Sequence, residues 1–223
     1  MLQRPNTEFQ IVSRSASLAE LLGAFSYALD LTEGQPAGHS VRCCWIGTQM
    51  ARALHLSESQ IRDIFYATLL KDLGCSSNAA RVADLFAGDD RALKLSFKLI
   101  GPTDADFGAF IMSDAGKDAE AAVRDAAIAN LCANAPEIMT GLIDTRCTRG
   151  ADIARQLRFN DDVATAIAHL DEHWDGSGLP TGRTGADIHV GGRIALLTQV
   201  ADVFFMAFGP DAARSEIERR AGS

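Results

Sequence analysis

The sequence predicts an all-α fold, a bundle of helices around one core. Nearly every patterned segment repeats its apolar residues at intervals of three and four, which is helical spacing, and not in strict alternation. The 223-residue chain is 47% hydrophobic but has only six prolines and two tyrosines, which disfavours a strand-rich domain. A charged fraction of 22% is ordinary for a globular domain with a substantial core.

The first predicted helix begins at a capping box, because Ser17 and Glu20 have the S-x-x-E spacing. We expect residues 1–16 to be an N-terminal extension and residues 17–223 to form a single domain. The apolar face of the first helix is expected to comprise Leu18, Leu21, Leu22, Phe25 and Leu29.

Two further helices are expected before residue 75. One begins near His39, and the other begins at a second capping box, Ser57 and Gln60. The apolar stripe of the latter helix, continued past Leu69, places Asp72 on the buried side. A buried carboxylate costs several kcal/mol unless a cation or several donors compensate it, so Asp72 needs a partner.

The helical pattern weakens between about residues 86 and 120, where four glycines and Pro102 interrupt it. We predict a divergent insertion of short helices and loops there. Regular helices are expected to resume over residues 120–139, 149–157, 161–174 and 193–208. The last of these is apolar almost all round and contains Asp202 as its only acidic residue, so Asp202 is the second carboxylate expected to be buried.

Net charge and apolar runs limit the partners and the location. A net charge of −8 and a pI near 5.1 argue against nucleic acid and anionic lipid, which need a basic face. A small-molecule ligand, including a nucleotide, or a signalling protein is expected instead, with a homodimer as a further alternative. We find no apolar run of signal-peptide or membrane-span length, which predicts a cytoplasmic protein that does not enter a membrane. The five cysteines form no C-x-x-C pair and are expected to be reduced.

Four segments together resemble the HD-GYP family. They are "GHSVR" at 38–42, "LLKDLG" at 69–74, "DEHWDGSGLP" at 171–180 and "RIALLTQVADVF" at 193–204. The resemblance covers roughly residues 17–208. It implies an HD-superfamily helical bundle and, in members that are active, a phosphohydrolase that cleaves cyclic di-GMP with two or three iron, manganese or similar ions.

When the functional residues of the family are compared with this sequence position by position, some are kept and others are replaced. His39, Asp72 and Asp202 fall on metal ligands of the family. Other family positions are changed: the histidine of the His-Asp doublet is Lys71, and a histidine of an earlier helix is Arg146 or Cys147. The remaining departures are Cys75 for a lysine, Leu170 and Asp171 for paired histidines, and Leu179 for the tyrosine.

These departures lead to two predicted functions. The first is a degenerate, catalytically inactive regulatory domain with no cofactor, which binds a ligand or a partner protein. The alternative is an active phosphohydrolase with a divalent metal such as iron or manganese on His39, Asp72 and Asp202, and with Lys71 and Asp72 in catalysis. The candidate ligand-binding residues are Ser76, Ser77, Asn78, Arg81, Arg146, Asp171 and Glu172.

Three more hypotheses concern the replaced positions. Asp171 could act as a fourth metal ligand, and His169 with His173, four residues apart on one expected helix face, could substitute for lost histidines. Lys71 and Arg146 are expected to compensate Asp72 and Asp202 as fixed cations. The alternative for Lys71 is that its ammonium group reaches solvent from the flank of its helix.

Overall fold

The structure is a computed structural model that describes residues 17–101 and 103–222, so the predicted extension at 1–16 lies outside the described residues. Within them, the regular elements are α-helices and two short 3-10 helices, with one isolated bridge between Asp175 and Thr184, so the all-α prediction is confirmed. The elements are α1 Leu18–Thr32, α2 His39–Ala53, α3 Glu58–Leu69, η1 Cys75–Asn78, α4 Ala79–Phe86, α5 Asp90–Phe97, α6 Asp104–Asp114, α7 Ala121–Gln156, α8 Asp161–Ala168, η2 Gly185–Asp187, α9 Val190–Phe208 and α10 Pro210–Arg219.

Both predicted capping boxes are present. Ser17 accepts a hydrogen bond from the Glu20 backbone at the start of α1, and Ser57 accepts one from the Gln60 backbone at the start of α3. The helix α3 ends at Leu69, so the segment that carries Asp72 is a turn and not the last helical turn.

The apolar face of α1 differs from the prediction. Leu22 and Leu29 are buried, whereas Leu18, Leu21 and Phe25 are between 45% and 58% exposed. The helix lies at the margin of the bundle and packs on α2, α3 and η1, so only one edge of its broad apolar stripe meets the core.

The long helix α7 replaces two predicted separate helices. It runs over 36 residues, with a kink at Asn134, whose φ of −125° and ψ of 17° are not helical. Pro136 lies two residues further on, and a proline removes one backbone donor and crowds the preceding turn. The sequence between residues 140 and 148 contains Gly141 but no proline, and the helix continues through it.

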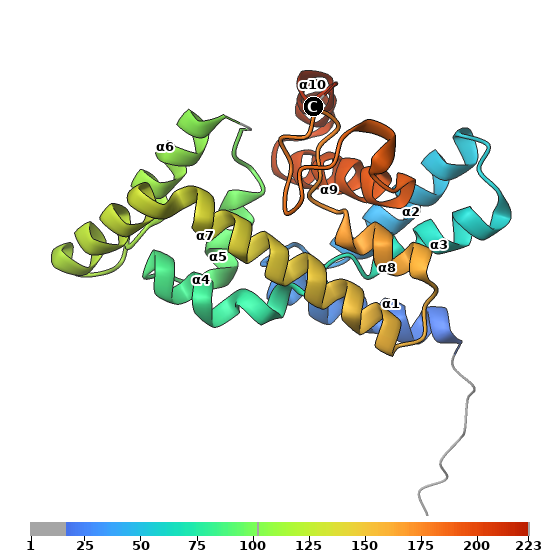
Figure 1. Ribbon diagram of the computed structural model, residues 1–223, viewed down its shortest axis with the longest axis horizontal. Coiled ribbons are helices and arrows are strands. Elements are labelled where there is room, and N and C mark those ends of the chain that lie inside the picture. The colour runs from blue at the N-terminus through green and yellow to red at the C-terminus, as the bar shows by residue number, and fades with distance from the viewer. Residues whose placement is uncertain (1–16, 102, 223) are drawn as a thin grey trace, which may run out of the picture.

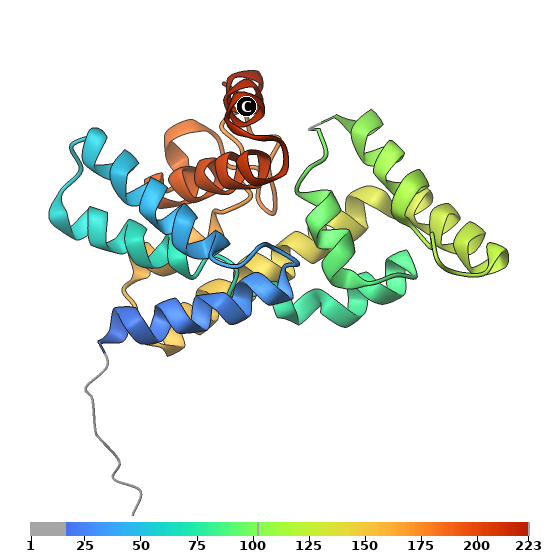
Figure 2. The same cartoon turned by 180° about the vertical axis from the view of Figure 1, so that it is seen from behind.

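The helix α7 joins two packed regions, as Figures 1 and 2 show. Its N-terminal half packs with α4, α5 and α6 around an aromatic core that includes Phe86 and Phe110. Its C-terminal half packs with α8 and the bundle of α1, α2 and α3, around a core that includes Leu70 and Ile167. The helix α9 crosses the bundle and packs on α2, α3, α8 and α10.

The helix α9 is the one helix of the described residues that is long and apolar enough to cross a membrane, whereas the sequence reasoning found no such run. In the fold, 56% of that stretch is buried against neighbouring helices, as in the central helix of a bundle.

The helix α8 ends at Ala168, six residues before the predicted end at Trp174. The chain then turns into the glycine-rich loop, and the Leu179 amide donates back to the Asp171 carbonyl at 2.9 Å. The expectation that His169 and His173 share a helix face is therefore wrong. His169 accepts a hydrogen bond from the His189 amide, and His173 contacts Ser177 in the loop.

Candidate active site and its groove

A buried pair of His39 from α2 and Asp202 from α9 forms the first part of the site. His39 Nδ1 lies 2.7 Å from Asp202 Oδ2, although 163 positions separate the two residues in the chain. Gly38, in the left-handed region with φ of 83°, caps the N-terminus of α2, and His39 is the first residue of that helix. His39 is fully buried and Asp202 is 3% exposed.

Arg42, one helical turn after His39, binds the same carboxylate. Its Nε donates to Asp202 Oδ1 at 2.6 Å and its Nη2 donates to Oδ2 at 3.0 Å, a forked pair. Burial opposes ionisation of Asp202, but the hydrogen bonds from His39 and Arg42 hold its pKa below the ordinary value. The sequence reasoning assigned this compensation to Arg146, and that assignment is wrong.

His39 and Asp202 have the protonation states that metal binding requires. Burial, and then the charge of Lys71, lowers the pKa of His39 to about 4, so its imidazole is neutral at physiological pH. A neutral imidazole and a carboxylate suit divalent transition metals. His39 Nδ1 and Asp202 Oδ2 share a hydrogen bond at 2.7 Å, and a metal ion bound to both atoms would displace its proton. The donor set therefore fits one ion.

Cys43 offers a third donor atom, within 4.8 Å of the donor atoms of His39 and Asp202. Its thiol donates to the Thr198 carbonyl at 3.5 Å. Burial raises the thiol pKa to about 12, so Cys43 is protonated and is a weak ligand.

The second buried carboxylate, Asp72, has a different environment. Lys71, also fully buried, donates from Nζ to Asp72 Oδ2, and Lys98 Nζ lies 4.0 Å from Oδ1. Burial opposes ionisation of Asp72, but the charges of Lys71 and Lys98 hold its pKa far below the ordinary value. Lys71 thus compensates Asp72, and the alternative that Lys71 reaches solvent is wrong. A carboxylate held between two ammonium groups does not fit a second metal ion.

Glu33, at the end of α1, extends this ionic cluster. Lys98 Nζ lies 2.7 Å from Glu33 Oε2, and Lys94 Nζ lies 3.4 Å from Oε1. Lys94 also pairs with the more exposed Asp90 at 3.1 Å. Lys71, Asp72, Lys94, Lys98 and Glu33 are called the ionic cluster below.

Arg146 of α7 pairs with Asp171, which follows α8, through a hydrogen bond from Nη2 to Oδ2. The Cys147 thiol also donates to Asp171 Oδ2, at 3.3 Å. Burial disfavours the charged guanidinium, but Asp171 and its neighbours raise the pKa of Arg146 above the ordinary value. Arg146 is therefore a fixed cation, and Asp171 is engaged by it.

A groove of about 490 Å³ lies between the aromatic core region and the bundle. Lys98, Arg146 and Asp171 line it, together with Gln199 and Val203, which lie on either side of Asp202 along α9. In Figures 1 and 2 the segment of α5 and α6 lies apart from α9 and α10. The groove therefore adjoins both the ionic cluster and the His39–Asp202 pair.

The other candidate ligand-binding residues do not line this groove. Ser76 and Ser77 are exposed in η1, and Arg81 is exposed beside Gly141 of α7. Asn78 donates from Nδ2 to the Leu142 carbonyl at 2.6 Å and so joins η1 to α7.

Glu172 has a structural environment within the glycine-rich loop. Its carboxylate accepts hydrogen bonds from the backbone amides of Thr181 and Arg183, each at 2.9 Å, and from the Thr181 hydroxyl at 2.6 Å. These three bonds offset the cost of burial and lower the pKa of Glu172. They also close the loop, which explains the glutamate of the loop motif without a ligand.

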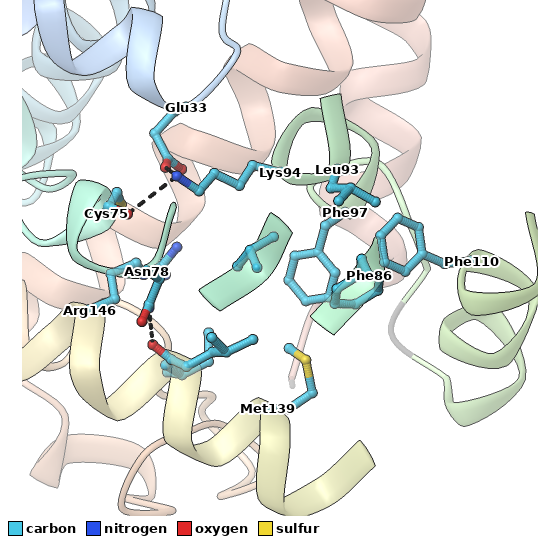
Figure 3. A pocket seen from close by; sticks show the side chains of 13 residues that line it. Glu33, Cys75, Asn78, Phe86, Leu93, Lys94, Phe97, Phe110, Met139 and Arg146 are labelled. Carbon is cyan, nitrogen blue, oxygen red and sulfur yellow. Dashed lines mark hydrogen bonds and ion pairs between the residues drawn. The ribbon is translucent and has the colours of Figure 1, made fainter. Parts of the chain in front are cut away.

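A smaller interior cavity of about 80 Å³ lies beside the groove (Figure 3). Glu33, Cys75 and Asn78 form its polar end, and Phe86 and Phe110 lie on its apolar side. Lys94 lines this cavity and not the groove, whereas Lys98 lines the groove.

The sequence reasoning missed Arg42, Lys98 and Glu33 as members of the site. Arg42 was visible in "GHSVR", three residues after His39 and thus on the same side of a helix. Lys94 and Lys98 have the i, i+4 spacing that aligns two side chains, but no sequence pattern indicates which carboxylates they meet.

The fold and the site define an all-helical protein with a buried histidine–aspartate pair beside a groove between two helical regions. Residues 127–212 match the HD domain family. The chain is 44% identical over 212 residues to the 3'3'-cGAMP-specific phosphodiesterase 3 of Vibrio cholerae. The aligned residues cover 95% of this chain and 46% of that protein. It also resembles the crystal structure of the V. cholerae cyclic GMP-AMP specific phosphodiesterase V-cGAP3, with a TM-score of 0.67 and 41% identity over 92% of this chain and 45% of that one.

This chain belongs to the HD superfamily and has the all-α HD fold. It spans about half the length of the relatives it matches. The narrower assignment to the HD-GYP family stays a prediction.

The first predicted function, a degenerate regulatory domain without catalysis or cofactor, is wrong. The relative that is 44% identical over 212 residues and the matching solved structure are both phosphodiesterases, which favours the alternative of an active enzyme. The sequence reasoning gave too much weight to missing histidines, because it could not show that His39 and Asp202 still converge in the fold.

Proposed function

We propose that this chain is the whole or a part of a metal-dependent HD phosphodiesterase that hydrolyses a phosphodiester bond of a cyclic dinucleotide. The main support for this proposal is that the chain, over 95% of its length, is 44% identical to a 3'3'-cGAMP-specific phosphodiesterase. The His39–Asp202 pair and the adjoining groove supply a metal-binding element and a space for substrate. A groove of this size lies within the usual range for small-molecule sites, about 300–1,000 Å³.

His39 and Asp202 would hold a divalent ion such as iron or manganese. The ion would supply a Lewis acid and lower the pKa of a bound water, which is the usual source of a nucleophile in such hydrolases. Arg42 donates to both oxygens of the Asp202 carboxylate and would give up at least one of these hydrogen bonds to the ion. Asp72 is held by lysines, so we assign it to the electrostatics of the site and not to metal binding.

The proposal is tested with the full chain, incubated with 3'3'-cGAMP or cyclic di-GMP and with manganese or iron, while the products are separated by chromatography. We expect turnover that chelation abolishes. Asp202→Asn removes a ligand and should lower both bound metal, measured by mass spectrometry, and turnover by at least about tenfold. Asp118→Asn, at an exposed position, is the control and should match the wild type. Folded, metal-supplied protein that cleaves neither nucleotide contradicts the proposal.

A cyclic dinucleotide would be the small-molecule partner expected from the acidic composition. We also propose a cytoplasmic location for the chain. Binding to a signalling protein and a homodimer stay predictions, and light scattering on the purified chain tests the dimer.

A further inference from the structure

Two cations with little exposed surface line the groove. Lys98 follows the last residue of α5 and its side chain is 6% exposed, whereas Arg146 lies on α7 and its side chain is 14% exposed. Both residues line the groove, and neither is a candidate metal ligand.

Each of these cations has a buried donor atom without a hydrogen bond of ordinary geometry in the described part of the chain. Lys98 Nζ is ion-paired with Glu33 but forms no hydrogen bond of ordinary geometry with any described residue. Arg146 directs Nη2 to Asp171, while its Nε is buried without a hydrogen-bond partner in the described part of the chain. Buried donors are satisfied in most proteins, so unused donors beside a groove indicate a ligand that accepts hydrogen bonds.

The chemistry of the donors indicates an anion. A cyclic dinucleotide carries a negative charge on each of its two phosphodiester groups, and a phosphate oxygen accepts strong hydrogen bonds from ammonium and guanidinium groups. Lys98 and Arg146 are held in place by Glu33 and Asp171, so their side chains lose little freedom when a ligand binds.

We propose that Lys98 and Arg146 form a phosphate-binding site in the groove, which positions one phosphodiester group of the substrate. This inference rests on the proposed function and deepens it. Lys98 and Arg146 are positioning residues, and the His39–Asp202 pair is the metal-binding element.

The ionic cluster contains a matched control. Lys94 lies one helical turn before Lys98 and also pairs with Glu33, but it lines the interior cavity and not the groove. Lys94→Met and Lys98→Met therefore each leave Glu33 with one lysine, and the two variants differ in whether the lost side chain lines the groove.

Binding of 3'3'-cGAMP to chelator-treated protein is measured by isothermal titration calorimetry, so that neither metal nor turnover contributes. Lys98→Met should raise Kd by at least about tenfold, because a hydrogen-bonded charge pair is lost. Lys94→Met should stay within about twofold of the wild type, and Lys98→Arg should recover most of the binding. Arg146→Lys keeps the charge but loses the Nε donor, so it should also weaken binding. This variant tests the inference even if Lys98→Met does not fold.

With manganese present, Lys98→Met should raise KM more than it lowers kcat. If the wild type binds and cleaves 3'3'-cGAMP but Lys98→Met and Arg146→Lys both keep the wild-type Kd, the inference is overturned and the proposed function stands. Equal weakening by Lys94→Met and Lys98→Met also overturns it, because the effect then acts through Glu33. A folded wild type that neither binds nor cleaves 3'3'-cGAMP overturns the inference and the proposed substrate together.

Discussion

Asp72 and Asp202 are both buried carboxylates of the same domain, but their partners differ. Asp202 contacts a neutral imidazole and a guanidinium whose side chain is 32% exposed. Asp72 contacts the fully buried ammonium group of Lys71 and lies near Lys98. Burial alone therefore does not make a carboxylate a metal ligand. A partner that is neutral or can move aside leaves room for a metal ion, whereas a buried fixed cation occupies the position that the metal ion would take.

The two sites are electrostatically linked. The charges of Lys71 and Lys98 favour the neutral form of His39, whereas Asp72 opposes this effect. The cations around Asp72 therefore help to keep His39 in the form that binds a metal ion.

Replacement of Lys71 tests whether a cation is essential next to Asp72. Lys71→Met should lower the free energy of unfolding by about 3–5 kcal/mol, because it leaves a buried carboxylate without its main partner. Urea denaturation measures the change. Lys117→Met, at an exposed position, should stay within about 0.5 kcal/mol. A loss below about 1 kcal/mol for Lys71→Met would remove the distinction between the two carboxylates.

The pH dependence of stability tests the neutral state of His39. Unfolded histidine takes up a proton near pH 6.5, but folded His39 does so only near its pKa of about 4. Acid therefore favours the unfolded state, and stability should fall by about 2 kcal/mol between pH 7 and pH 5.

The comparison uses chelator-treated wild type and His39→Gln, each unfolded in urea at several pH values. The variant should lack this part of the decline, since its other titrating groups are shared with the wild type. Parallel curves for the two proteins would show that His39 is not held neutral.

Glu172 is a third kind of buried carboxylate, because neutral donors hold it. Thr181→Val removes one of its three hydrogen bonds and should lower the free energy of unfolding by about 1 kcal/mol. Thr181→Ser keeps the hydroxyl group and is the control. A loss as large as that of Lys71→Met would show that the kind of partner does not decide the energy.

Replacement of Arg42 should have the smallest effect on stability. Arg42→Ala removes a partly exposed partner of Asp202 and should cost at most about 1 kcal/mol in chelator-treated protein. Because the guanidinium competes with a cation for the carboxylate, manganese affinity measured by calorimetry should rise. A weaker affinity would show that Arg42 helps to form the metal site.

Local sequence patterns determined much of the helical framework. The capping boxes at Ser17 and Ser57 predicted the starts of α1 and α3, because such caps use residues only three positions apart. The motifs around His39 and Asp202 indicated the HD superfamily. Helix ends were less well predicted, since the continuity of α7 through residues 140–148 and the early end of α8 depend on packing as well as on local preference.

Only the tertiary structure decided which charges meet. The sequence indicated that Asp72 and Asp202 are buried, but Arg42 and not Arg146 pairs with Asp202 across 160 positions of the chain. It also decided that Lys98, from a region predicted as an insertion, reaches the ionic cluster and the groove. Periodicity predicts the side of a helix that is buried, but the partner of a buried charge depends on how distant helices pack against one another.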